Sequence, residues 1–246
     1  MIPEAVRALE RDLRGIFGSR LQSLAIYGAR AAAHDAHHGH GGHDHHAAPT
    51  RTLAIVASMT RDDLRSAATR VEAWHEAGLA TPLLLESREF AQSLDAFPLE
   101  FGAILADHDL VSGDNPFASL TVDPADLRRA VEVQARSHLL HLREGFLETR
   151  GRADALSMLI LQSAPAFVAL ITSIARLDGK ADGNPPSAAR HVERLVGHSE
   201  AGAISEVVKL AAARDLASAA ADQLFPPYLE ALERIVSYVD GWSAPR

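Results

Sequence analysis

The densest group of potential metal ligands in this 246-residue chain is a histidine-rich segment at residues 34–46. Seven of its thirteen residues are histidines, and Asp35 and Asp44 could add oxygen ligands. The seven are His34, His37, His38, His40, His43, His45 and His46. Imidazole is the commonest side-chain ligand for transition metals near neutral pH. The segment therefore predicts a loop that binds a divalent transition metal, zinc or nickel.

A flexible polar insertion that takes up metal only adventitiously is the alternative interpretation of the same segment. Gly39, Gly41 and Gly42 would let the backbone fold around an ion, and they equally favour a loop without fixed structure before binding. The position of the segment favours the first interpretation, because it joins two predicted strands directly after a glycine turn.

Those two strands are short apolar segments, Leu21–Tyr27 and Thr52–Ser58. The first ends in the turn Gly28-Ala29-Arg30, and a strand, a glycine turn, a loop and a second strand form an arrangement that can hold a ligand over the end of a sheet. We expect the two strands to be neighbours in one small mixed sheet. The turn itself has two interpretations, a phosphate or nucleotide cradle and a plain reversal of the chain.

Around this pair the sequence predicts an α/β region followed by an all-helical region. The first region starts with helical periodicity at residues 3–17 and, after the two strands, one helix that starts at Thr60 and ends at Gly78. A buried strand at 81–86, a helix or helix pair at 88–105 broken near Pro98, and a short edge strand at 109–113 complete it. From Asp123-Pro124, a strong helix start, the helical pattern continues to residue 239, and the last helix is expected to kink or restart at Pro226-Pro227. We therefore expect an α/β domain at residues 1–115 and a helical bundle domain at residues 120–241.

Composition narrows the class of protein. The formal net charge of −8 argues against an extended surface for nucleic acid or anionic membrane, and the absence of cysteine excludes disulfides and thiol chemistry. The N-terminal residues lack the apolar region of a signal peptide, so we expect a cytoplasmic protein. Residues 155–175 carry no charge, and their serines, threonine, glutamine and alanines favour a central bundle helix over a membrane span.

The order of these elements resembles the nucleotidyltransferase superfamily, including its kanamycin-type and minimal bacterial members with a helical C-terminal half. The resemblance rests on Ile26-Tyr27-Gly28-Ala29-Arg30, on Leu94-Asp-x-Phe-Pro-Leu-Glu-Phe101 and on the turn at Asp114. It implies that Gly28, Ala29 and Arg30 are a residual nucleotide turn. It also implies a motif Asp-x-Asp on the second strand, whose carboxylates hold magnesium ions for phosphoryl transfer.

The chain departs from that pattern where the chemistry is done. Ala29 stands where the family has serine, and Thr50 and Thr52 stand where the paired aspartates belong. Threonine hydroxyls are neutral and cannot replace two carboxylates around a hard dication. Glu86 is the only acid of the third strand, and Asp62 and Asp63 are better explained as residues that start a helix.

The sequence therefore favours a degenerate, non-catalytic protein with the nucleotidyltransferase fold. It would act as a binding or regulatory module with a metal-binding histidine loop. We do not expect it to bind a magnesium-nucleotide complex. The alternative is an active nucleotidyltransferase with atypical metal ligands that transfers a nucleoside monophosphate to a small molecule or protein. A third hypothesis is a module that forms a homodimer through the helical bundle. Nucleic acid is not an expected partner because of the negative net charge, and RNA cleavage is not expected because Arg194 and His198 lack the spacing of a helical ribonuclease pair.

Overall fold

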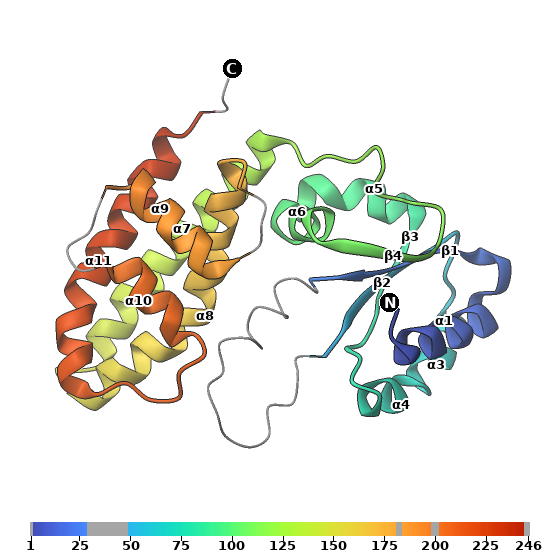
Figure 1. The fold of residues 1–246 in the computed structure, drawn as a ribbon, viewed down its shortest axis with the longest axis horizontal. Coiled ribbons are helices and arrows are strands. Elements are labelled where there is room, and N and C mark those ends of the chain that lie inside the picture. Colours follow the sequence, from blue (N-terminus) through green and yellow to red (C-terminus); the bar gives the residue numbers. More distant parts are fainter. Residues whose placement is uncertain (1, 29–48, 181–183, 198–201, 244–246) are drawn as a thin grey trace. The chain divides into compact units, whose positions relative to one another are not determined.

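The computed structural model describes residues 2–28, 49–180, 184–197 and 202–243, and it separates into two compact units (Figure 1). The first unit is Met1–Val122 and the second is Asp123–Arg246. The boundary directly precedes the helix start that the sequence predicts. There the Asp123 Oδ1 atom accepts a hydrogen bond from the backbone N–H of Ala125 at 2.7 Å, which caps the first helix of the second unit.

The first unit is built on a four-stranded mixed sheet. Its strands are β1 (Leu21–Tyr27), β2 (Arg51–Val56), β3 (Leu83–Glu86) and β4 (His108–Gly113), in the order β3-β2-β1-β4. β1 runs antiparallel to both of its neighbours, β2 and β4, and β2 runs parallel to β3. The predicted pairing of the two strands that flank the histidine-rich segment is confirmed.

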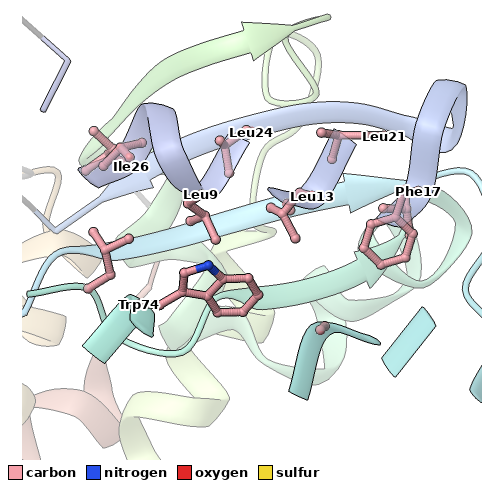
Figure 2. Packing of buried hydrophobic residues seen from close by; sticks show 12 residues of the cluster. Leu9, Leu13, Phe17, Leu21, Leu24, Ile26 and Trp74 are labelled. Carbon is pink, nitrogen blue, oxygen red and sulfur yellow. The ribbon is translucent and has the colours of Figure 1, made fainter. Parts of the chain in front are cut away.

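Both faces of β1 and β2 are covered by helices, which bury the apolar side chains that these strands direct to either side. On one face lies α1 (Glu4–Phe17), whose buried residues Val6, Leu9, Leu13 and Phe17 recur every three or four positions. Figure 2 shows this layer, in which Leu9, Leu13 and Phe17 of α1 lie beside Leu21, Leu24 and Ile26 of β1, with Trp74 next to them. The Trp74 indole donates a hydrogen bond of 2.9 Å to the carboxylate of Asp12, which belongs to α1.

The opposite face of the sheet is covered by α5 (Ser87–Ala96) and α6 (Pro98–Ala106). Phe90, Phe101 and Ile104 from these helices pack on the side chains that β1 and β2 direct to this face. The predicted helix pair with a break at Pro98 is confirmed. β3 was expected to be a buried strand and is half-exposed instead, because it is an edge strand that pairs only with β2.

One helix of the first unit differs from the expectation. The single helix predicted after Thr60 is two helices, α3 (Arg61–Ala68) and α4 (Val71–Glu76). A short 3-10 turn, η1 (Gly18–Arg20), joins α1 to β1 earlier in the chain. The break shifts the buried positions, so that Ala67 and Trp74 face the core while Leu64 is 47% exposed. The capping box at Thr60 and Asp63 is present as predicted.

The second unit is a bundle of α7 (Pro124–Glu148), α8 (Ala153–Leu177), α9 (Pro185–Leu195), α10 (Ala203–Leu210) and α11 (Ser218–Gly241). α8 is the central helix and packs against the other four. By length and composition α8 could cross a membrane, and its apolar residues Ile160, Phe167 and Ile174 are fully buried inside the bundle.

α11 continues through Pro226-Pro227 as one helix, so the predicted restart there is wrong, and the alternative, a kink, stays a prediction. Each proline removes one intrahelical hydrogen bond and crowds the preceding turn. The flanking residues Phe225 and Tyr228 are buried, and their packing stabilises the helical conformation on both sides of the two prolines.

Candidate functional site

The candidate site lies at the end of β1, where the chain turns at Gly28. This residue has a φ of +68°, a backbone conformation that favours glycine. Its N–H donates a hydrogen bond of 3.0 Å to the carbonyl oxygen of Asp107, which precedes β4. A side chain at this position would also collide with Arg51, because a Cβ atom would lie 2.3 Å from the Arg51 Nη2 atom. The left-handed backbone is therefore the reason for glycine here, because the Arg51 guanidinium is the end of a flexible, exposed side chain that can move aside.

Arg51 brings a positive charge to this turn. It is the first residue of β2, it pairs with Tyr27 across the ladder, and its guanidinium carbon lies 5.4 Å from the centre of the Tyr27 ring. The residue is exposed, and none of the carboxylates in the described ranges forms an ion pair with it. An anion that approaches Gly28 would therefore meet an available guanidinium, the side chain best shaped for two hydrogen bonds to a phosphate.

The two threonines of this region do not replace carboxylates. Thr52 pairs with Ile26 and is fully buried, and its Oγ1 atom has no hydrogen-bond partner among the described residues. Thr50 forms an isolated bridge to Leu79 just before the strand. Because side chains alternate along a strand, one face of β2 carries Thr52, Ala54 and Val56 and the other carries Arg51, Leu53 and Ile55. Neither face offers an acid, so β2 does not fit a pair of magnesium ions.

The nearby acids that the sequence offered have structural roles at the other end of the sheet. Glu86 pairs in register with Val56, far along the ladder from Gly28, and its Oε1 atom accepts the N–H of Met59 at 2.7 Å. Asp63 receives two hydrogen bonds of 2.7 Å from Arg20. These bonds, with those from Thr60, hold the pKa of Asp63 well below its usual range. Asp63 is therefore a helix-start residue, as predicted, and forms the capping box of α3 with the N-cap Thr60.

β4 brings two further acids to the Gly28 end, and sequence reasoning missed them. In the β1–β4 ladder His108 pairs with Tyr27 and Asp109 pairs with Ile26, while Asp107 holds the Gly28 N–H through its backbone. The His108 Nδ1 atom lies 3.1 Å from the carbonyl oxygens of Ile104 and Leu105. The available signal was the spacing Asp107-x-Asp109 followed by leucine, which is the spacing of the family motif. Within the described ranges, no three histidine or acidic side chains are grouped to hold a metal ion.

The remaining predicted site residues lie outside the described residues. They are Ala29 and Arg30 of the turn and the seven histidines His34, His37, His38, His40, His43, His45 and His46. Metal binding by the histidine-rich segment therefore stays a prediction from the sequence.

Comparison with known proteins gives one informative result. No protein-family model matches the chain, and no curated protein matches it significantly. A solved structure that is similar is a spectinomycin adenyltransferase from Enterococcus faecialis, determined with ATP and spectinomycin. The two chains share 10% sequence identity with a TM-score of 0.56, over 96% of this chain and 98% of the other. At this identity the likeness concerns the fold, and it spans both units. The chain therefore has a nucleotidyltransferase-like fold: a small mixed sheet followed by a helical half.

Proposed function

We propose that this protein is a non-catalytic nucleotidyltransferase-fold module that binds a phosphate-bearing ligand, such as a nucleotide, at Gly28 and Arg51 without a divalent metal. The observation that carries the proposal is the position of Arg51. Its guanidinium lies against the glycine turn, at the start of a strand that has no acid on either face. The module would act by binding, as a regulatory or adaptor protein.

The charge at the site decides between binding and catalysis. Two-metal phosphoryl transfer needs carboxylates that hold the ions and so stabilise both the attacking and the leaving oxygen. Arg51 is a permanent cation, which attracts a phosphate and repels a magnesium ion at the same place. The arrangement supports phosphate binding in place of metal-assisted transfer.

The histidine-rich segment gives the proposed module a second binding element. In the sequence it lies between Gly28 and Arg51, so both of its ends connect to residues of the candidate site. Seven histidines at several spacings suit zinc or nickel, ions that prefer imidazole ligands. Binding of such an ion to the segment is thus proposed as a second binding activity of the module.

Calorimetric titration with ATP tests the proposal. We expect binding of equal affinity in excess EDTA and in magnesium, and we expect Arg51→Ala to weaken it about tenfold or more, since a charge-assisted hydrogen bond is lost. Arg88→Ala, which removes an exposed arginine from the start of α5, serves as the matched control and should bind as the wild type does. Binding that requires magnesium, or that is unchanged in Arg51→Ala, would overturn the proposal.

An active transferase with atypical ligands remains the second candidate, and one observation favours it. Asp107 and Asp109 lie on the other side of β1, at the same end of the sheet as Gly28. If they hold a metal, ATP binding should depend on magnesium and should fall in Asp109→Asn. The proposal made here expects neither change, so the same titration separates the two functions.

A further inference from the structure

A pocket of about 370 Å³ opens between α7 and α8 in the helical unit. Its polar lining includes Gln134 and His138 from α7 and Ser163 from α8, and Leu142, Leu159 and Ala166 give apolar walls. The volume is within the range of small-molecule sites. All of the lining residues belong to the second unit.

A directed chain of hydrogen bonds forms at this pocket. The Ser163 hydroxyl donates to the Ile160 carbonyl oxygen at 2.9 Å, and a carbonyl can only accept. The Ser163 oxygen is therefore left to accept the proton of the Tyr228 hydroxyl, which lies 3.2 Å away. The Tyr228 oxygen in turn accepts from the Nε2–H of His138 at 2.7 Å. The network thus assigns the His138 proton to Nε2.

This assignment leaves an unused acceptor on the imidazole. The Nδ1 atom of His138 has a lone pair and no hydrogen-bond partner among the described residues. Burial, and secondarily His141, lowers the pKa of His138 to about 4, so the ring is neutral at physiological pH. The Oε1 atom of Gln134, one helical turn earlier, is buried and also has no partner in the described part of the chain. Two acceptors on one face of α7 therefore lack donors.

The lining also defines the charge of a ligand. It contains no lysine, arginine, aspartate or glutamate, so a charged group that entered would lose its hydration without gaining a counter-ion. The apolar walls of Leu142, Leu159 and Ala166 favour a hydrophobic body. We propose that this pocket binds an uncharged small molecule that combines an apolar ring with an N–H donor, such as a carboxamide or a heteroaromatic amine. The donor bonds to the His138 Nδ1 atom, and a rotation of the Gln134 side chain brings its buried Oε1 atom to the same ligand.

Four probes with one ring and different head groups test this assignment on the full-length protein. They are benzamide, methyl benzoate, benzoate and benzylammonium, titrated while the ¹³Cε1–H signal of His138 is followed by NMR. We expect benzamide to shift that signal with millimolar affinity, in keeping with so small a ligand. Methyl benzoate, which has the same ring but no donor, should bind about tenfold more weakly. Benzoate and benzylammonium should leave the signal unchanged.

Variants show whether the acceptor is responsible. Gln134→Met keeps the length of the side chain and removes the acceptor, so benzamide affinity should fall about tenfold. Gln223→Met, the same substitution at an exposed position of α11, should have no effect. The His138 signal and helical circular dichroism report whether each variant is folded. The proposal is overturned if methyl benzoate binds as tightly as benzamide, if Gln134→Met binds as the wild type does, or if no probe shifts His138 at about 10 mM.

Discussion

Gly113 provides a sharp test of the β1–β4 ladder, which places Asp107 and Asp109 beside the Gly28 turn. This last residue of β4 pairs with Ser23 and has a φ of +84°. A Cβ atom there would lie 1.8 Å from the Gln22 carbonyl oxygen, which is backbone and cannot rotate away. Gly113→Ala must therefore push β4 away from β1.

The size of the effect follows from a comparison with Gly78. Gly78 has a similar φ of +77°, but a Cβ there would meet no heavy atom within 4 Å. A left-handed alanine costs about 1–2 kcal/mol, and a stiffer unfolded chain returns about 0.4–1 kcal/mol. Gly78→Ala should thus lower the free energy of unfolding by about 1 kcal/mol. Gly113→Ala adds an overpacking cost of about 1–3 kcal/mol, for a total of about 2–4 kcal/mol.

Urea unfolding followed by Trp74 fluorescence is the assay, in a Trp242→Phe background so that the first unit is reported alone. Trp74 is 3% exposed and packs against α1, so its emission should shift when this unit unfolds. We expect the midpoint of Gly113→Ala to lie clearly below that of Gly78→Ala. Equal midpoints for the two variants would refute the pairing of Gly113 with Ser23 at this end of the β1–β4 ladder.

Three further predictions concern charge and metal. Asp63 has a lowered pKa in the folded state, so the unfolded chain binds more protons as the pH falls below about 4, and stability decreases there. Asp63→Asn should remove that part of the pH dependence of urea unfolding. His138, with its pKa lowered to about 4, should likewise make the helical unit lose stability as the pH falls from about 6.5 towards 4, and NMR titration should show a ring that stays neutral across this range. Wild type should bind zinc or nickel in calorimetry at micromolar metal, and a variant that lacks residues 34–46 should not; equal binding by both would show the segment to be a linker.

The strands and helices with strong local signals could be predicted from the sequence. The short aliphatic segments on either side of residues 34–46 predicted strands, and both are strands. Asp123-Pro124 predicted the first residue of a helix, which is where α7 begins. The break between α3 and α4 and the continuity of α11 through Pro226-Pro227 depend on packing in the folded unit, which local propensity does not report.

The candidate site was harder to predict, because it depends on strand register. The loss of acids from β2 is visible in the sequence, but the approach of Arg51 to Gly28 appears only once Tyr27 and Arg51 are paired. β4 carries polar residues and pairs with a strand some 90 residues earlier, so its side chains could not be placed. The hydrogen-bond chain of His138, Tyr228 and Ser163 likewise joins residues 65 and 90 positions apart.

The central claim is that the protein does not transfer nucleotides, and a transfer assay tests it most directly. The wild type would be incubated with α-³²P-labelled nucleoside triphosphates, magnesium or manganese, and a panel of aminoglycoside, protein and hydroxyl acceptors. Without carboxylates on β2, the loss of metal stabilisation amounts to several kcal/mol, a rate lower by about a thousandfold or more. We predict no incorporation above that of the Asp107→Asn/Asp109→Asn variant. Incorporation by the wild type that this double variant abolishes would contradict the account and identify β4 as the metal-binding strand.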